Sequence, residues 1–280
     1  MNVRCLGLLL LLLWLPAQAG IRVLDDAGRE VVLAGPAQRI VSLAPHITEL
    51  LFAAGAGAQL VGVSGFSDYP EAARAITRIS GGSGLDLEAI LALQPDLVVA
   101  WQSGNPEAGI QRLIALGIPV FISEPRRLED VPDTLPRLGQ LAGTGAEASA
   151  RAAAFTRRHA DLAEQYSGQP VVRVFYQVWD RPLMTVNGEH LISDVIRLCG
   201  GRNVFRDLPA LAPQVGIEAV LAADPDVIVV GSDAAGPAAE LQAWRQWPSM
   251  QAVAQDQLYT VRRELLVRQG PRILDGAEQL

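Results

Sequence analysis

The sequence predicts an α/β fold in which two Rossmann-like lobes are joined by a single long α-helix. Three observations lead to this prediction: strand and helix patterns alternate along most of the chain, one helix and strand unit occurs twice, and a long helical pattern lies between its two copies. Alternating strands and helices are typical of a mainly parallel sheet with helices on its faces. Two such sheets separated by a helix imply two lobes.

The repeated unit occupies residues 87–100 and again residues 217–230. In each copy, apolar residues at helical spacing end at a Pro-Asp pair, and a short run rich in β-branched residues follows. Each copy therefore predicts a short helix, a break and a buried strand. One unit used twice indicates two similar lobes with a cleft between them, and such clefts are favoured places for small ligands. Chance recurrence within an ordinary α/β protein is the alternative.

The first lobe begins with a predicted hairpin and continues with strands and helices in alternation. Residues 21–34 contain two apolar strands around an Asp-Ala-Gly turn. After Pro45 the apolar spacing is helical up to Gly55, where a left-handed residue is expected to end the helix. The strands of the first sheet are predicted at residues 39–43, 60–64, 97–101 and 119–122.

Residues 146–165 carry the long helical pattern, which contains Ala, Arg, Glu and Leu but no proline or glycine. At about 1.5 Å per residue such a helix is roughly 30 Å long, the width of a small domain. We therefore expect it to bridge the two lobes, and an ordinary surface helix is the alternative. The second lobe is predicted from a strand at 171–176, a helix at 191–198, the second copy of the repeat and a strand at 258–261.

The amino-terminal residues have the composition of a cleavable secretory signal. Arg4 supplies a positive charge, a leucine-rich run follows, and Ala17-Gln18-Ala19 matches a small-residue cleavage site. The apolar run is shorter than the roughly 20 residues that span a bilayer, so export is expected. The predicted organisation is a signal peptide at 1–19, a first lobe at 20–143, a bridging helix at 144–168 and a second lobe at 169–280.

The composition excludes several classes of function. The chain has no lysine, which excludes P-loop nucleotide sites and lysine Schiff bases such as those of pyridoxal phosphate. A net charge of −7 without a basic run argues against nucleic acid as a partner. The three histidines His46, His159 and His190 are scattered, so we predict no enzyme and no cofactor. A secreted hydrolase or metal-dependent enzyme on the same frame is the alternative from another class.

Four segments, at residues 39–50, 61–70, 87–101 and 199–205, resemble the helix-bridged substrate-binding proteins of bacterial ABC importers. The resemblance covers essentially the whole mature chain and is strongest to the corrinoid-binding members. It implies a periplasmic protein that captures a corrinoid (cobalamin or cobinamide) between its lobes. The protein would deliver the corrinoid to an ABC transporter permease and its ATPase complex at the inner membrane. Capture of haem or a ferric siderophore is the alternative.

The resemblance also implies which residues meet each partner. One glutamate on each lobe, Glu88 and Glu218, would pair with arginines of the permease, and the alternative is that they are ordinary first-turn glutamates stabilised by the helix dipole. The ligand-binding residues would be Pro45, His46, Phe66, Gly82, Ser83, Trp101, Trp179, Met184, Leu211, Ala212, Glu264 and Arg268.

These residue types suit a wide, largely apolar ring edged with amides. Aromatic faces bury the plane of the ring, whereas Glu264 and Arg268 would bond its amides and phosphate. Gly82 and Ala212 stand where corrinoid binders typically have tryptophans, and Glu264 replaces an aspartate. His46 is expected to hydrogen-bond near a helix start, and ligation of the cobalt of a truncated corrinoid or the iron of haem is the alternative, so no metal site is predicted.

Overall fold

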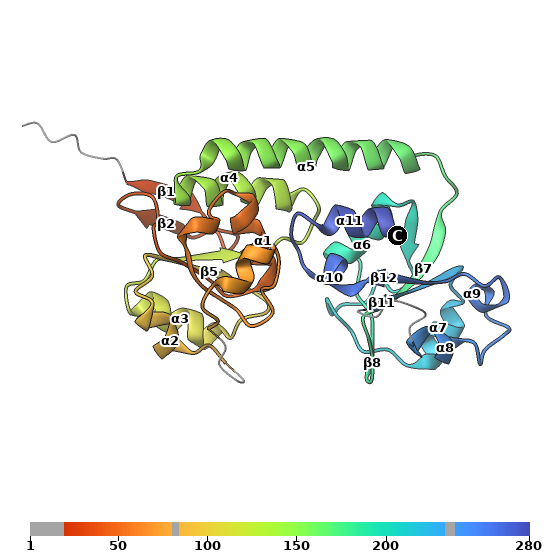
Figure 1. The fold of residues 1–280 in the computed structure, drawn as a ribbon. Helices are drawn as coiled ribbons and strands as arrows, with labels where there is room; N and C mark the ends of the chain where they lie inside the picture. Colours follow the sequence, from red (N-terminus) through yellow and green to blue (C-terminus); the bar gives the residue numbers. More distant parts are fainter. Residues whose placement is uncertain (1–19, 80–83, 233–238) are drawn as a thin grey trace, which may run out of the picture.

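A computed structural model describes residues 20–79, 84–232 and 239–280 of the chain. Figure 1 shows two lobes side by side, with the long helix α5 (Gly145–Tyr166) running along one side of both. The predicted fold class, two α/β lobes joined by one long helix, is confirmed. The predicted signal peptide and the predicted ligand residues Gly82 and Ser83 lie outside the described residues.

The first lobe contains an antiparallel hairpin and a parallel sheet. The hairpin consists of β1 (Ile21–Leu24) and β2 (Glu30–Leu33). The other elements are β3 (Ile40–Ser42), α1 (Pro45–Ala53), η1 (Gly57–Gln59), β4 (Leu60–Val63), η2 (Glu71–Ala75), α2 (Leu87–Ala92), β5 (Leu97–Trp101), α3 (Glu107–Ala115), β6 (Val120–Ser123) and α4 (Asp130–Ala142). The sheet has the order β4-β3-β5-β6, and its neighbouring strands are parallel.

The second lobe repeats this arrangement and adds a small hairpin. Its elements are β7 (Val172–Gln177), β8 (Trp179–Asp180), β9 (Leu183–Met184), α6 (Leu191–Leu198), β10 (Gly201–Asn203), α7 (Ile217–Ala223), β11 (Val227–Ser232), α8 (Ala239–Trp244), α9 (Gln251–Ala254), β12 (Leu258–Arg262), α10 (Arg263–Val267) and α11 (Ile273–Gln279). The parallel sheet has the order β10-β7-β11-β12, whereas β8 and β9 pair antiparallel.

In each parallel sheet, the strand that comes first along the chain lies between the second and the third strands of that sheet. In the first lobe, β4 lies on one side of β3 and β5 lies on the other. In the second lobe, β10 and β11 flank β7 in the same way. Ligands of open parallel sheets bind outside the carboxyl ends of the strands at such a switch of direction. The segments that follow β3, β5, β7 and β11 are therefore where a ligand is expected.

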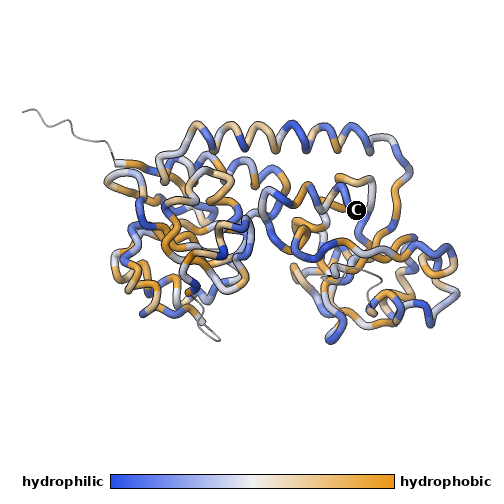
Figure 2. Tube along the Cα trace, viewed as in Figure 1, coloured by the Kyte–Doolittle hydropathy of each residue, from blue (hydrophilic) through white to orange (hydrophobic). Residues whose placement is uncertain are grey.

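Alternate residues of the central strands face two different cores. In β5, Val98 and Ala100 pack with residues of α2 and α3, whereas Leu97 and Val99 face the side of α1 and α4. This second core continues into the other lobe, where it includes residues of α6, β11 and α11. Figure 2 shows hydrophobic segments inside both lobes and an alternation of hydrophobic and hydrophilic residues along α5. One apolar core therefore runs beneath α5 and joins the lobes.

The bridging helix contacts the first lobe by close packing and the second lobe by salt bridges. Near its start it packs on α4 at Gly139, where an added Cβ would lie 2.4 Å from the Cβ of Ala148, so only glycine allows this approach. Farther along, Arg158 forms salt bridges with Asp275 (2.6 Å) and Glu278 (2.8 Å) of α11. Across the described ranges, no helix has both the length and the apolarity needed to cross a bilayer.

The Pro-Asp pair of the repeat has the same role in both lobes. The Asp96 carboxylate accepts hydrogen bonds from the backbone N–H groups of Gln38 (2.8 Å) and Arg39 (2.9 Å), immediately before β3. The Asp226 carboxylate accepts one from the backbone N–H of Arg173 (2.8 Å), in β7. Each aspartate therefore ties the strand that follows it to the first strand of its own lobe.

Two arginines complete the same connection. The Arg39 guanidinium donates to the carbonyl of Leu93 (2.7 Å) at the end of α2, and that of Arg173 donates to the carbonyl of Asp224 (2.8 Å) at the end of α7. The last carbonyls of a helix have no partner within the helix and lie at the negative end of its dipole. A guanidinium is therefore well placed at both helix ends.

We expect Asp96→Ala and Asp226→Ala each to lower the free energy of unfolding by about 1–2 kcal/mol, because backbone N–H groups lose their acceptor. Urea unfolding followed by circular dichroism measures this change. Asp161→Ala, on the exposed face of α5, removes the same charge and is expected to change stability by less than about 0.5 kcal/mol. Unfolding midpoints equal to that of the control would contradict the proposed tie.

Candidate functional site

The two lobes meet at a buried carboxylate. Glu49 lies in α1 of the first lobe and is only 3% exposed. Its two oxygens accept hydrogen bonds from Nε (3.0 Å) and Nη2 (2.9 Å) of Arg272, and one oxygen also accepts from Nη1 of Arg268 (3.0 Å). Both arginines belong to the second lobe, and a bidentate pair of this kind is among the stronger charge-assisted contacts in proteins. The contact therefore holds the lobes in one arrangement.

Further groups of the first lobe surround the same arginines. Arg268 forms a salt bridge with Asp68 (2.8 Å) and donates to the carbonyl of Phe66 (3.2 Å). The Arg272 guanidinium stacks over the ring of Tyr69 at 3.8 Å. Burial is the largest single influence on the pKa of Asp68 and raises it, but the hydrogen bond and the charge of Arg268, with smaller contributions that include the charge of Arg74, together lower the pKa of this carboxyl. We call the group of Glu49, Asp68, Tyr69, Arg268 and Arg272 the interlobe ion cluster.

Glu264 and Arg268, predicted as one ligand-binding pair, have different partners in the structure. Arg268 belongs to the interlobe ion cluster, whereas Glu264 contacts Arg272 (3.4 Å) and Arg262 (3.7 Å). Their binding of a ligand stays a prediction. Sequence reasoning missed the role of Glu49, although its position within the apolar pattern of α1 was a usable signal, because a buried carboxylate requires a partner.

His46 and Trp101 meet at the carboxyl ends of β3 and β5. Their rings are 5.1 Å apart and nearly perpendicular. His46 is 3% exposed, and its Nε2, like Nε1 of Trp101, is buried without a hydrogen-bond partner in the described part of the chain. Burial, and secondarily the charge of Arg268, lowers the pKa of His46 to about 3. The imidazole is therefore neutral, and His46 packs here instead of forming the hydrogen bond that the sequence predicted.

The potential metal-binding side chains of the described residues are scattered, and Cys199 is partly buried. Within residues 20–79, 84–232 and 239–280, no three His, Cys, Asp or Glu side chains are grouped closely enough to hold a metal ion. The thiol of Cys199 donates to the carbonyl of Ala277 (3.4 Å), and burial raises its pKa to about 11. Cys199 is therefore a neutral packing residue in this arrangement.

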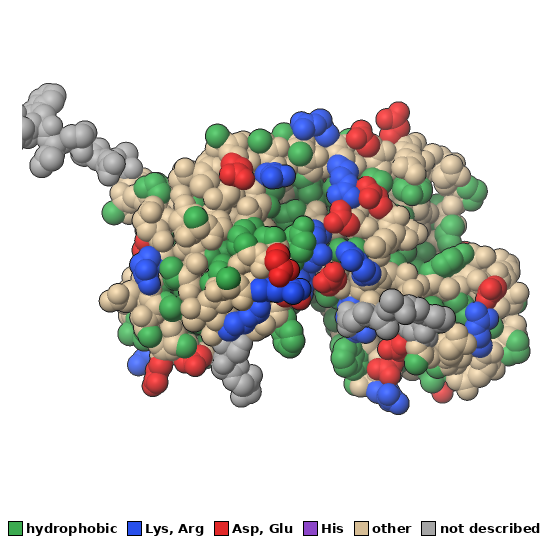
Figure 3. Space-filling view, in the orientation of Figure 1, with side chains coloured by type: hydrophobic (Ala, Val, Ile, Leu, Met, Phe, Trp, Pro, Cys, Tyr) green, Lys and Arg blue, Asp and Glu red, His purple; other side chains and the backbone are tan. Residues whose placement is uncertain are grey.

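Two predicted ligand residues, Phe66 and Trp179, are exposed aromatic side chains on opposite lobes. Phe66 is 82% exposed on the segment after β4, and Trp179 is 51% exposed on the β8–β9 hairpin. The guanidinium of Arg263 lies 5.1 Å from the Trp179 ring. Figure 3 shows charged side chains of both signs where the lobes meet, and a notch between the lobes below this contact. Small-molecule sites are lined mainly by hydrophobic and aromatic side chains, so these two rings are candidates for contact with a ligand.

The remaining predicted ligand residues lie in α1, in the β8–β9 hairpin and in a loop of the second lobe. Pro45 is half-buried in the first turn of α1, beside His46. Met184 pairs with Trp179 across the small hairpin. The loop that contains Leu211 and Ala212 runs alongside, where the Leu211 carbonyl accepts from the backbone N–H of Asn187 (3.0 Å). Pro45 thus lies on the first lobe and Met184, Leu211 and Ala212 on the second, and their contact with a ligand stays a prediction.

Glu88 and Glu218 occupy equivalent places in the two lobes. Each is exposed in the first turn of its helix, α2 or α7, and neither forms an ion pair with another described residue. Figure 1 shows both helices on the side of the molecule opposite α5. Two free carboxylates therefore point to solvent at matching places on the two lobes.

The buried His46 makes the stability of the fold sensitive to acid. Because its pKa is about 6.5 in the unfolded chain and about 3 in the folded one, the unfolded state binds more protons between these values. Stability contributed by neutral His46 is thus present above pH 6.5 and is lost as the pH falls. Between pH 7 and pH 5 we expect wild type to lose about 2 kcal/mol relative to His46→Gln. Parallel stability profiles in urea titrations would exclude this effect.

Comparison with known proteins identifies the family. The periplasmic binding protein family model matches residues 40–265. The vitamin B12-binding protein of Vibrio cholerae serotype O1 is 38% identical over 246 residues, 88% of this chain and 88% of the relative. The vitamin B12-binding protein of Yersinia pestis is 36% identical over 273 residues, 98% of this chain and 89% of the relative.

Solved structures agree with this result. The periplasmic vitamin B12-binding protein BtuF of Vibrio cholerae superposes with a TM-score of 0.80 at 37% identity, covering 87% of this chain and 95% of that one. The periplasmic haem-binding protein BhuT, at 22% identity and a TM-score of 0.76, covers 87% of this chain and 96% of its own, and shares the fold. Two lobes of equal topology, a bridging helix and a family match over most of the chain lead to one conclusion. The chain belongs to the periplasmic binding protein family, in its helix-bridged class.

Proposed function

We propose that this protein captures a corrinoid, cobalamin or cobinamide, between its lobes and delivers it to the permease of an ABC transporter. The observation that carries the proposal is a pair of exposed aromatic side chains, Phe66 beside the interlobe ion cluster and Trp179 on the other lobe. Such rings suit the apolar faces of a corrin. The relatives named as vitamin B12-binding proteins support this choice of ligand.

Several finer statements belong to the same proposal. The protein acts by binding and release and is not an enzyme, and the corrinoid is cargo rather than a resident cofactor. Residues 1–19 direct it to the periplasm and are removed as a signal peptide. The partners are the permease and its ATPase complex. The buried, neutral His46 supports a corrinoid held by packing rather than by a histidine ligand.

Titration calorimetry of the chain from Gly20 onward tests the ligand. We expect cyanocobalamin or dicyanocobinamide to bind with one site per chain, and haemin to bind more weakly or not at all. Visible absorption spectra identify which compound is held. Binding of haemin alone would replace the corrinoid by the alternative ligand, and binding of none would refute the proposal.

The two exposed aromatic residues provide a test of the cleft. Phe66→Ala and Trp179→Ala are each expected to weaken cyanocobalamin binding roughly tenfold or more, because truncating a buried aromatic contact typically costs about 1–3 kcal/mol. Leu116→Ala, which truncates a similarly exposed apolar side chain after α3, is the matched control and should keep wild-type affinity. Unchanged affinity in both aromatic variants would show that the ligand binds elsewhere.

The exposed glutamates provide a test of delivery. The double variant Glu88→Ala/Glu218→Ala is expected to bind cyanocobalamin like wild type but to lose uptake in cells or in vesicles that contain the transporter. Asp161→Ala/Glu164→Ala removes the same charge from the exposed face of α5 and should keep uptake. Because paired charges across an interface set orientation and association rate, added salt should also slow delivery. Normal uptake by the first variant would remove both glutamates from the docking surface.

A further inference from the structure

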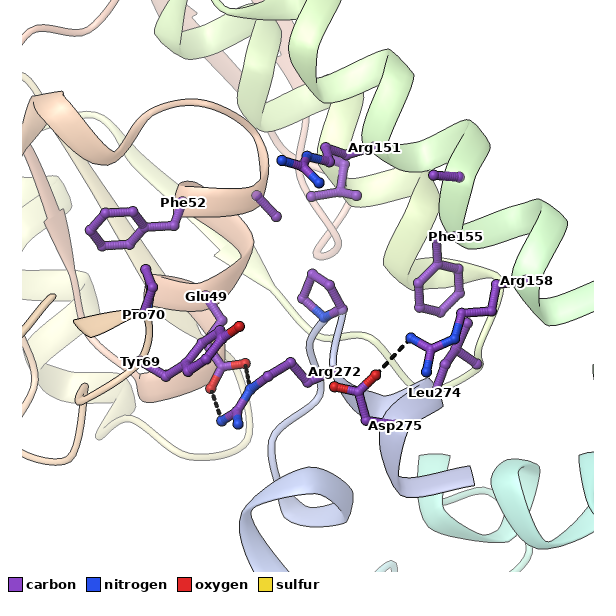
Figure 4. A pocket seen from close by; sticks show the side chains of 14 residues that line it. Glu49, Phe52, Tyr69, Pro70, Arg151, Phe155, Arg158, Arg272, Leu274 and Asp275 are labelled. Carbon is purple, nitrogen blue, oxygen red and sulfur yellow. Dashed lines mark hydrogen bonds and ion pairs between the residues drawn. The ribbon is translucent and has the colours of Figure 1, made fainter. Parts of the chain in front are cut away.

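A cavity of about 470 Å³ lies beneath α5, behind the interlobe ion cluster. Its walls come from α1 and α4 of the first lobe, from α5, and from the segment that leads into α11 of the second lobe. Its apolar lining includes Phe52, Leu135, Phe155 and Leu274. Figure 4 shows Phe155 pointing from α5 into this space, with Phe52 on the far wall. Cavities of roughly 300–1,000 Å³ with mainly apolar walls are typical of small-molecule sites.

This cavity is separate from the cleft described above. Pro45 and His46, in the first turn of α1, belong to the cleft, whereas Glu49 and Phe52, farther along the helix, line the cavity. The contact between Glu49 and Arg272 stands at its edge, as the dashed lines in Figure 4 show. A molecule in the cavity would therefore touch both lobes without entering the cleft.

The charged groups around the cavity are neutralised with one exception. Glu49 is paired with two arginines, and Arg158 is paired with Asp275 and Glu278. Arg151 lines the cavity at its solvent-exposed edge, and within the described chain it forms neither an ion pair nor a side-chain hydrogen bond. Figure 4 shows its side chain extending from α5 toward the wall formed by α1. The cavity thus combines apolar walls with a single cation that lacks a counter-charge.

We propose that this cavity is a second small-molecule site, which binds an apolar monocarboxylate through Arg151. A guanidinium and a carboxylate form two parallel hydrogen bonds, and the apolar walls cover the body of the ligand. The volume lies within the usual range of small-molecule sites, and a straight ten-carbon chain is a suitable probe. Because Arg151 is the one unpaired cation among the described lining residues, a monoanion is favoured over a dianion. This site is independent of the corrinoid proposed for the cleft.

Calorimetry with decanoate, and with decanol as its uncharged analogue, tests the proposal on the chain from Gly20 onward. We expect one site for decanoate and roughly tenfold weaker binding of decanol, because the alcohol cannot form the charge-assisted contact. Arg151→Gln should weaken decanoate binding by a similar factor. Arg157→Gln is the matched control, because it removes an exposed, unpaired arginine that lies on the same helix outside the cavity, and it should bind like wild type.

A second pair of variants tests the location without touching a charge. Ala154 is exposed and lines the cavity, so Ala154→Trp should block decanoate, whereas Ala153→Trp, exposed on α5 but outside the cavity, should not. Circular dichroism confirms that each variant is folded. Saturating cyanocobalamin should leave decanoate bound, which separates this site from the cleft. No decanoate binding, equal binding in Arg151→Gln and wild type, or displacement by cyanocobalamin would each overturn the proposal.

Discussion

The arrangement of the two lobes depends on the burial of Glu49. A carboxylate removed from water is strongly unfavourable unless it is paired and hydrogen-bonded, and the groups that pair with it, Arg268 and Arg272, come from the other lobe. Separating the lobes at this point would break the pairing of four charges at once, those of Glu49, Asp68, Arg268 and Arg272. Together with the apolar core beneath α5, this contact explains why the lobes form one body. Hinge movement during ligand capture must therefore preserve or rebuild the cluster.

Helix α1 connects the functional parts of the molecule because successive turns face different surroundings. Its first turn brings Pro45 and His46 to the carboxyl end of β3, where a ligand of a parallel sheet is expected. Its second turn carries Glu49 to the interlobe ion cluster, and Phe52 lines the cavity beneath α5. A change in the position of α1 would therefore move side chains in the cleft, at the contact between the lobes and in the cavity. Arg268 extends this link, because it also holds the backbone of Phe66.

The repeat explains how two lobes acquire equivalent surfaces. In each lobe an aspartate and an arginine fasten the repeat to the first strand, so α2 and α7 take the same position relative to their sheets. Glu88 and Glu218 follow as a matched pair of exposed carboxylates. Their equivalence was visible in the sequence, because it needs only the alignment of two segments. That Asp96 and Asp226 bond the neighbouring strand was not visible, because strand pairing is not local.

Sequence by itself determined the α/β class, the repeat and the bridging helix, because these follow from periodicity and from turn residues that act over a few positions. It missed α4, whose internal Pro136 contradicts a simple helical pattern, and the small β8–β9 hairpin. Only the tertiary structure decided the partners of Glu49, which lie 219 and 223 positions later in the chain. It also decided the burial of His46 and the free charge of Arg151 beside an apolar cavity. Such features depend on which distant side chains the folded backbone brings together, and local pattern carries no information about them.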